Sequence, residues 1–184
     1  MTVNLTRVLA VILLIASFSA CKKKHEDSIV DIKKKFNTIN SKLSDYTRRQ
    51  VDDLTTKAGG TITGYYRDEE VKKIYSERFT DKDRAFTEYY FDDGMLIYVL
   101  KQEYVYNRPT YYNEEMAKQN ADSVWYDDKK TRLDISRFYL SDHKLIKWIG
   151  PAGMDVAVND PKFHQKQEEL LAETIIMLKQ LNEQ

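Results

Sequence analysis

The hydrophobic period of this sequence changes at the Gly59-Gly60 pair, and this change determines the fold class. Before the pair, apolar residues recur at helical spacing from Ile29 onward. After it, the chain divides into short segments in which apolar and polar residues alternate, as in strands buried on one side. Tight polar turns join several of these segments, and Asp93-Gly94 is the strongest hairpin signal among them. Consecutive strands joined by such short turns favour an antiparallel meander over parallel crossovers.

The two patterns together predict an α+β domain with a long N-terminal helix, an antiparallel meander and a C-terminal helix packed on the sheet. The first helix is expected over residues 28–58, with Ser28 as its N-cap. It would be roughly 46 Å long, whereas each strand would span only about 20–27 Å. The meander is expected to have about six strands: Thr61–Arg67, Val71–Phe79, Ala85–Asp92, Met95–Asn107, Leu133–Ser141 and Lys144–Ile149.

The C-terminal helix is expected to begin after Asp160, which can act as its N-cap, with Pro161 in the first turn. Its apolar face is broad enough to pack on a sheet, on a second helix, or on both. Because the first helix would be longer than the sheet, we expect its uncovered end to pack on the C-terminal helix. Self-association into a coiled coil is the alternative. The residues expected at the contact between the two helices are Ile29, Ile32 and Phe36 on one side and Met177, Leu178 and Leu181 on the other.

The first 21 residues have the pattern of an export signal. Met1–Arg7 carries one positive charge, Val8–Phe18 is almost wholly apolar, and two small residues precede Cys21. The apolar run is shorter than the roughly 20 residues that a membrane span needs. A short buried helix that opens the domain is the alternative, but the lysines at 22–24 follow with no amphipathic pattern.

The stretch Phe18-Ser19-Ala20-Cys21 resembles the lipobox of bacterial lipoproteins, although an aliphatic residue is usual where Phe18 stands. In that family a diacylglyceryl group is attached to the cysteine sulfur, signal peptidase II cleaves just before it, and the new amino group is often acylated. The resemblance therefore implies that Cys21 is a lipid anchor. The implied organisation is a cleaved signal at 1–20, a lipidated tether at 21–27 and a single α+β domain at 28–184.

The resemblance also bears on location and on thiol chemistry. Cys21 is the only cysteine of the chain, so no disulfide can form within it, and a thioether to lipid removes an exposed thiol. Lys22 is not the Asp that marks inner-membrane retention in enteric bacteria, so the family pattern implies the outer membrane. Each buried methylene of the acyl chains would contribute about 0.8 kcal/mol to anchoring.

The balance of charge argues against some partners. Loss of Arg7 with the signal leaves one more acidic than basic residue, and this near-neutral balance gives no global attraction to nucleic acid. Two lysine clusters, at 22–24 and 33–35, lie close to the expected anchor. They can contact anionic lipid head groups, at about 1 kcal/mol per residue, or form an ordinary solvated surface.

For the oligomeric state, we expect a monomer.

An internal repeat is visible in the predicted hairpins. The segments GYYRDEE-VKKI (64–74), EYYFDDGMLIYV (88–99) and RFYLSDHKLIKW (137–148) each have aromatic residues, a polar turn and an aliphatic strand. In this alignment the first copy is one residue shorter than the other two. These units resemble the repeats of YwqK-type antitoxin proteins and, more distantly, MORN repeats. The resemblance implies an array of hairpins and an antitoxin-like role.

The sequence contains no recognisable catalytic set. It has no Gly-rich phosphate loop, nucleophile elbow or metal-binding helix motif. His143 is expected in a hairpin turn, and His164 with Glu168 is expected to form a surface pair rather than part of a zinc site. We therefore expect no cofactor, no metal and a non-enzymatic binding or structural role in the cell envelope. The alternatives are an immunity or inhibitor lipoprotein and an envelope glycan hydrolase.

Strand alternation predicts a tyrosine-rich face of the sheet. Tyr66, Tyr90, Tyr98 and Tyr139 are expected there. Their expected neighbours on this face are Glu88, Asp92, Arg137, Ser141 and Lys147, and Tyr104 and Tyr106 can extend the row. Tyrosine suits contact with an envelope protein or glycan, but it also favours any half-exposed sheet face, and the loop at 109–132 can cover the row. The opposite face, expected beneath the helices, would carry Tyr89, Phe91, Ile97, Val99, Phe138, Leu140, Ile146 and Trp148.

Overall fold

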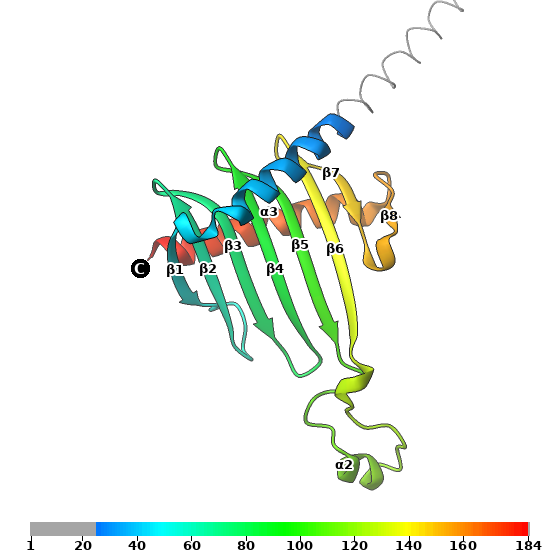
Figure 1. The fold of residues 1–184 in the computed structure, drawn as a ribbon. Helices are drawn as coiled ribbons and strands as arrows, with labels where there is room; N and C mark the ends of the chain where they lie inside the picture. Colours follow the sequence, from blue (N-terminus) through cyan, green and yellow to red (C-terminus); the bar gives the residue numbers. More distant parts are fainter. Residues whose placement is uncertain (1–24, 184) are drawn as a thin grey trace, which may run out of the picture.

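The computed structural model describes residues 25–183 as one antiparallel sheet between two helices (Figure 1). The eight strands lie in the order in which they occur in the chain, so the sheet is a pure meander. They are β1 (Thr47–Asp52), β2 (Gly60–Arg67), β3 (Glu70–Phe79), β4 (Asp83–Asp92), β5 (Met95–Val105), β6 (Arg132–Ser141), β7 (Lys144–Ile149) and β8 (Asp155–Val156). The helices are the N-terminal helix (residues 25–41), α2 (Glu114–Gln119) and α3 (Pro161–Asn182), with 3-10 turns η1 (Leu43–Asp45), η2 (Asp128–Lys130) and η3 (Pro151–Gly153).

The α+β class and the meander are confirmed, but the sheet has eight strands rather than about six. The six predicted strands agree with β2 to β7 within two residues at each end. The short strand β8 was not predicted. Asp160 caps α3 by accepting a hydrogen bond from the Lys162 backbone at 2.9 Å, and Asn113 caps α2 through the Met116 backbone.

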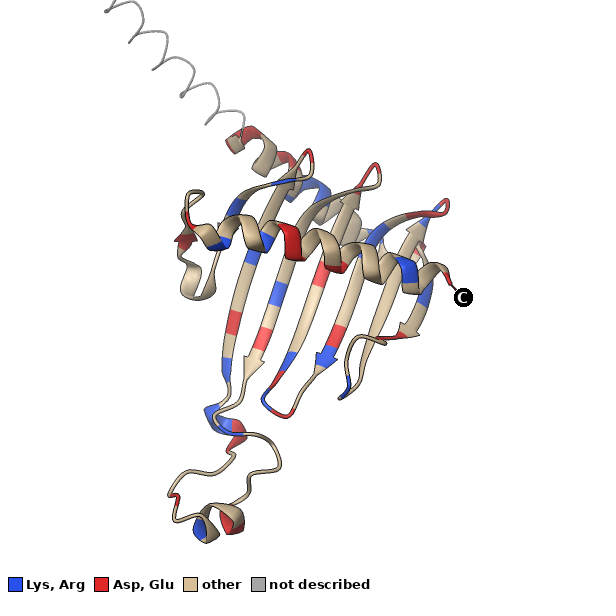
Figure 2. Ribbon diagram, turned by 180° about the vertical axis from the view of Figure 1, so that it is seen from behind, with Lys and Arg blue, Asp and Glu red and all other residues tan. Residues whose placement is uncertain are grey.

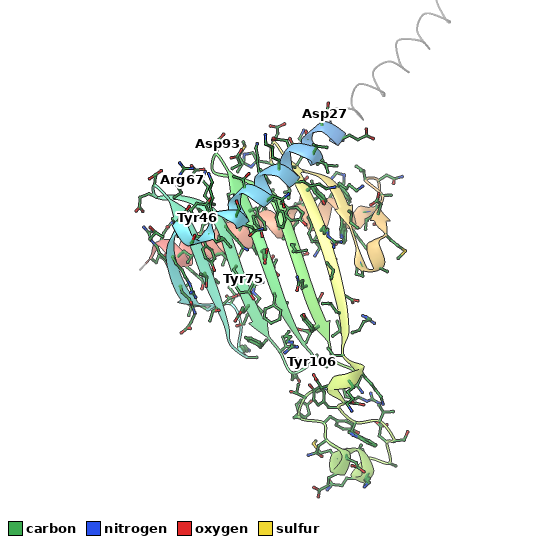
Figure 3. The ribbon with its side chains drawn as sticks, in the orientation of Figure 1. Asp27, Tyr46, Arg67, Tyr75, Asp93 and Tyr106 are labelled. Atoms are coloured by element: carbon green, nitrogen blue, oxygen red, sulfur yellow. The ribbon has the colours of Figure 1, made fainter. Side chains whose placement is uncertain are left out.

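The prediction of a helix over residues 28–58 is wrong. Ser28 lies inside the helix rather than at its start, and the helix ends at residue 41. Residues 47–52 instead form β1, the edge strand that pairs with β2. Their spacing of apolar residues suits a helix, but pairing satisfies their backbone and buries Val51 against the sheet. The described part of the helix is about 26 Å long, and its first turn, at Asp27, projects past the edge of the sheet (Figure 3).

The two helices lie on opposite faces of the sheet, as Figures 1 and 2 both show. The predicted contact between the N-terminal helix and α3 is therefore wrong. Each helix covers its own apolar layer of the sheet. The core under α3 contains Val51, Ile62, Ile74, Tyr89, Phe91, Leu96, Val99, Phe138, Leu140, Leu145, Phe163, Leu170, Met177 and Leu181. The core under the N-terminal helix contains Ile32, Ile39, Tyr90, Ile97, Tyr98 and Tyr139.

The hairpins β2–β3, β4–β5 and β6–β7 have the same turn. Both central residues of each turn have φ between +48° and +71°, as a type I′ turn requires. Its backbone twist matches that of the strands it joins. The three central pairs are Asp68-Glu69, Asp93-Gly94 and Asp142-His143.

The second strand of each hairpin also carries one extra residue just after the turn. Lys72, Ile97 and Ile146 are each passed over in the pairing, which marks a β-bulge. The three hairpins therefore correspond over residues 63–74, 88–99 and 137–148 without any gap. The gap that the sequence alignment placed in the first copy is wrong, and Tyr65 rather than Tyr66 is the counterpart of Tyr90 and Tyr139.

The bulges explain which residues were assigned to the wrong face. Ile97 and Ile146 belong to the layer under the N-terminal helix, not to the layer under α3. Tyr66 lies on the α3 face, where its ring covers Gly64. A Cβ at Gly64 would meet the Tyr66 ring at 2.6 Å and Leu181 at 3.0 Å, so the absence of a side chain there makes room for the ring.

Replacing His143 with glycine should raise the free energy of unfolding by about 1 kcal/mol, because a side chain at φ +59° carries a steric cost that glycine avoids. The reciprocal change Gly94→His should lower it by a similar amount. A Cβ at Gly94 would meet no atom within 4 Å, so that cost is conformational. Urea unfolding measures both changes, and equal stability of wild type and His143→Gly would contradict the turn assignment.

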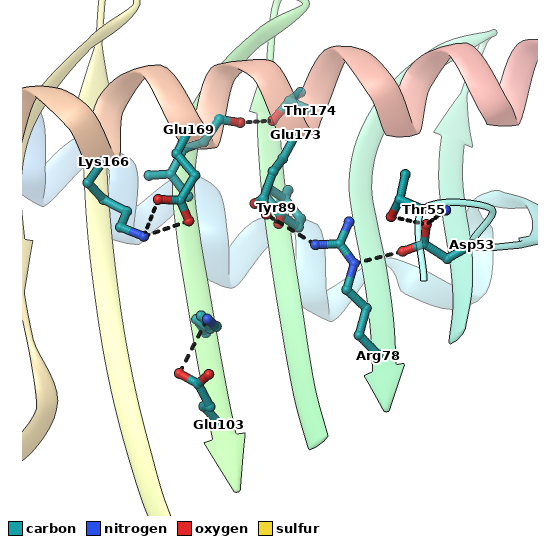
Figure 4. A network of polar contacts seen from close by, with 11 residues as sticks. Asp53, Thr55, Arg78, Tyr89, Glu103, Lys166, Glu169, Glu173 and Thr174 are labelled. Atoms are coloured by element: carbon teal, nitrogen blue, oxygen red, sulfur yellow. Dashed lines mark hydrogen bonds and ion pairs between the residues drawn. The ribbon is translucent and has the colours of Figure 1, made fainter. Parts of the chain in front are cut away.

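A chain of polar contacts ties α3 to the sheet (Figure 4). The Arg78 guanidinium donates through Nε to Asp53 at 2.7 Å and through Nη1 to Glu173 at 3.1 Å. The other oxygen of Glu173 accepts a hydrogen bond from the buried Tyr89 hydroxyl at 2.9 Å. Thr55 donates to Asp53 from its backbone and its hydroxyl. One arginine on β3 thus connects the loop after β1, β4 and α3.

Asp53 remains charged in this network although its side chain is fully buried. Burial alone would raise the pKa of the carboxyl group, but the hydrogen bonds from Thr55 and Arg78 outweigh it, and the pKa lies below its ordinary value. A pKa that is depressed in the folded state stabilises the fold above the unfolded pKa of about 3.9. This contribution is lost as the pH falls through the folded-state pKa.

Arg78→Leu should lower the free energy of unfolding by about 3 kcal/mol, because it leaves the Asp53 carboxylate buried without its cation. The matched control is Arg132→Leu, which removes an arginine that pairs with Asp134 at an exposed position and should cost less than about 1 kcal/mol. Chemical denaturation compares the two. Equal losses would show that the Arg78 network is no more than a surface ion pair.

Candidate functional site

The predicted binding tyrosines are buried. Tyr90 is 0%, Tyr98 6% and Tyr139 4% exposed, because the N-terminal helix covers them. Phe36 of that helix meets the rings of Tyr90 and Tyr98 edge-on, with centroids 4.9 and 5.3 Å apart. The sequence left two alternatives open for this row, exposure to solvent or cover by the loop at 109–132. Both are wrong, because the N-terminal helix covers the tyrosines. These tyrosines form the floor beneath the helix.

Polar groups hold the C-terminal end of the helix on this floor. The Asn40 amide donates to the Tyr90 hydroxyl at 3.0 Å, and that hydroxyl in turn donates to Glu88. Lys73 is almost fully buried and lies 3.2 Å from Glu88 and 3.1 Å from the Asn40 amide oxygen. Burial and the Glu88 carboxylate raise the pKa of Tyr90, so the phenol stays protonated as a donor.

A pocket of about 270 Å³ opens between the N-terminal helix and strands β5 and β6. Two of the predicted residues, Tyr98 and Tyr139, lie at its base, and Phe36 forms part of its wall. Strand pairing places the two tyrosines directly opposite each other, with ring centroids 5.0 Å apart. The full lining is Ile32, Lys33, Phe36, Asn37, Tyr98, Arg137 and Tyr139.

Two cations border this aromatic floor, Lys33 from the helix and Arg137 from β6. No ion pair or hydrogen bond joins either side chain to another residue within 25–183. The neighbouring Lys35 differs, since it lies 2.7 Å from Asp31 and 2.8 Å from Asp92, and these contacts raise its pKa. The lysine cluster at 33–35 is therefore not a uniform basic surface.

Neutral donors complete the pocket. Burial raises the pKa of Tyr98, the hydroxyl group of Tyr139 adds to this effect, and the charge of Arg137 acts in the opposite direction. The Tyr98 phenol therefore stays protonated at physiological pH. None of the seven lining residues is acidic. The pocket combines an apolar aromatic floor with positive charge at its rim, an arrangement that fits an anionic group attached to an apolar body.

A second aromatic surface lies on the same face of the sheet, beyond the N-terminal helix. Figure 3 shows Tyr75 in this part of the sheet. The Phe86 ring stacks against Tyr75 with centroids 6.4 Å apart and meets Tyr104 edge-on at 5.7 Å. The Arg84 guanidinium lies 4.6 Å from the Tyr104 centroid. Tyr104 was expected to extend the tyrosine row, whereas Tyr75 and Phe86 were not predicted on this face, although the alternation in β3 and β4 indicates their position.

Residues 106–131 form a lobe at the far end of the sheet from the start of the N-terminal helix (Figure 1). Asn107 closes it by donating to the Trp125 carbonyl at 2.9 Å and accepting from the Asp127 backbone at 3.0 Å. Arg108 pairs with Asp122 at 2.9 Å. The lobe exposes Tyr111 (59%) and Trp125 (41%) to solvent.

The histidines of the sequence analysis do not come together. His143 lies in a hairpin turn, as predicted, and His164 lies on the exposed side of α3. Within residues 25–183, no three His, Cys, Asp or Glu side chains are grouped as they would be around a metal ion. Cys21 and the lysines at 22–24 lie outside the described residues.

Comparison with protein families, with curated proteins and with solved structures finds no match to this chain. Within the described part of the chain, no helix combines the length and the apolar character needed to cross a bilayer.

Proposed function

We propose that this protein is a lipid-anchored component of a bacterial cell envelope, more specifically of the outer membrane, and that it acts by binding rather than by catalysis. The observation that carries the binding role is the pocket in which Lys33 and Arg137 border the rings of Phe36, Tyr98 and Tyr139. Lys33 is exposed and Arg137 half-buried, and no carboxylate lines the pocket, so both cations are available to an anionic ligand that lies on the aromatic floor. The membrane anchor is Cys21, as the lipobox resemblance implies.

The position of the pocket in the chain supports this proposal. Residue 25 is four positions beyond Cys21 in the sequence, so a chain of this length can span at most about 14 Å. Lys33 lies about 12 Å further along the helix axis. The same helix that follows the anchor forms one wall of the pocket. Binding would therefore take place close to the membrane surface.

An immunity or inhibitor role is the second candidate, and the lobe at 106–131 favours it. Its exposed Tyr111 and Trp125 are of the types enriched at protein interfaces. The lobe lies at the opposite end from the anchored helix, where it would face away from the membrane. The array of three equivalent hairpins is consistent with the repeat resemblance that suggested this role.

The anchor is tested by a fatty-acid label. We expect the label to enter the wild-type protein through the sulfur of Cys21, and Cys21→Ala to lose both the label and membrane association, because no other thiol is present. Ser19→Ala, a change within the lipobox region that keeps a small residue, is the control and should be labelled normally. A labelled, membrane-bound Cys21→Ala variant would disprove the lipoprotein proposal.

The binding role is tested by affinity capture from intact envelopes, followed by mass spectrometry of both the small molecules and the proteins recovered. The pocket proposal predicts that Lys33→Gln/Arg137→Gln loses a bound component, whereas Tyr111→Ser/Trp125→Ser retains it. A protein partner lost only from the lobe variant would instead support the inhibitor role. Identical recovery by the wild-type protein and both variants would contradict the two proposals together.

A further inference from the structure

The pocket formed by the N-terminal helix with β5 and β6 differs in its charge from a cavity on the opposite face of the sheet. A cavity of about 190 Å³ lies between α3 and the sheet and is also lined by charged residues. Its cations are compensated internally, since Arg78 pairs with Glu173, Lys101 with Glu103 and Lys166 with Glu169. The pocket under the N-terminal helix has two cations and no lining carboxylate.

The surroundings of this pocket do not neutralise it either. Glu88 stands on the same sheet face as Arg137, with Leu100 of β5 between them, so the two strands lie about 9.6 Å apart. Lys73 and the Tyr90 hydroxyl already engage the Glu88 carboxylate. Asp31 on the helix is paired with Lys35. Lys147, next to Tyr139 in the sheet, pairs with Asp155.

From this arrangement we infer that the pocket binds a small acid, in which one carboxylate or phosphate is attached to an aromatic or other flat apolar body. The inference deepens the proposed function and rests on it, because it names the ligand class of the same pocket. The anion lies between Arg137 and Lys33, and the guanidinium supplies paired N–H donors to its oxygens. The body lies on Tyr98, Tyr139 and Phe36.

The size and position of the polar groups set further limits on the ligand. At about 270 Å³ the pocket is smaller than typical drug-sized sites of 300–1,000 Å³, so it holds one ring or a short chain with its acid. The Asn37 amide at the rim and the protonated Tyr98 phenol at the base can donate or accept hydrogen bonds. A phospholipid head group has a polar body and would leave the aromatic floor without an apolar contact.

The full-length protein, purified in a neutral detergent, tests the inference by calorimetric titration with phenylacetate and phenyl phosphate. Both acids should bind, and phenylacetamide, which has the same shape as phenylacetate but no charge, should bind at least tenfold more weakly. Arg137→Gln and Lys33→Gln should each raise the Kd of phenylacetate about tenfold, as expected for loss of a charged hydrogen bond. Raising the salt concentration should also weaken binding.

The matched control is Lys34→Gln, which removes the same charge from the same helix but from a side chain that does not line this pocket. It should bind phenylacetate as the wild-type protein does, and the melting temperature of each variant confirms that the fold is kept. No binding of either acid at millimolar concentration, or equal binding of phenylacetamide, would overturn the inference.

A further arm separates the small acid from the membrane. In this arm, phosphatidylglycerol vesicles and phenylacetate each compete with bound phenyl phosphate. Displacement by the vesicles but not by phenylacetate would assign the site to lipid head groups and overturn the inference. The titrations test only the ligand class, whereas capture from envelopes tests the binding role, so a failed titration does not contradict the proposed function. If capture shows a component lost from the pocket variant while the acids do not bind, only the ligand class is wrong.

Discussion

The extra residue in the second strand of each repeated hairpin determines which face of the sheet every later side chain occupies. In β5, Leu96 lies under α3, the bulge residue Ile97 and then Tyr98 lie under the N-terminal helix, and Val99 lies under α3 again. A one-residue change of register exchanges the faces of a strand. The bulge therefore places two successive apolar side chains on the N-terminal helix side without removing any from the α3 side. The sheet has an apolar layer on each face, and one helix covers each layer.

The two cores do not use their helices in the same way. On the α3 side, Arg78 pairs with both Asp53 and Glu173, so these charges neutralise one another within the protein. On the other side, the paired charges gather at the C-terminal end of the N-terminal helix, around Asn40 and Lys73. The middle of that helix leaves Lys33 without a partner within 25–183. The asymmetry separates a structural face from a face that can bind.

Much of the fold was predictable because its signals are local. Type I′ turns need residues that tolerate positive φ, and Asp-Gly at 93–94 meets that need. The cap and proline at the start of α3 are equally local. The first helix was predicted too long because the apolar spacing of 46–54 suits a helix as well as an edge strand. Only pairing with β2, a contact between separate segments, decides between them.

The candidate site was predictable only in part, for the same physical reason. Alternation along β6 placed Arg137 beside Tyr139, and that placement holds. Tyr66 was assigned to the wrong face because the alignment of the repeats placed a gap in the first copy instead of recognising the bulge at Lys72. The gap aligned Tyr66 rather than Tyr65 with Tyr90, and an error of one residue exchanges the two faces of a strand. Lys33 could not be linked to Arg137 at all, because their proximity depends on where the helix crosses the sheet.

That crossing also explains why the tyrosines are buried rather than displayed. A tyrosine row on a sheet face offers a large apolar area, and covering it with an apolar helix stabilises the fold more than leaving it in water. Because the helix is narrower than the row, its edge leaves part of Tyr98 and Tyr139 at the base of a pocket instead of in a sealed core. The helix that closes the second core thus creates the opening at its own edge. Its sequence supplies Lys33 at that edge, opposite the arginine that β6 supplies.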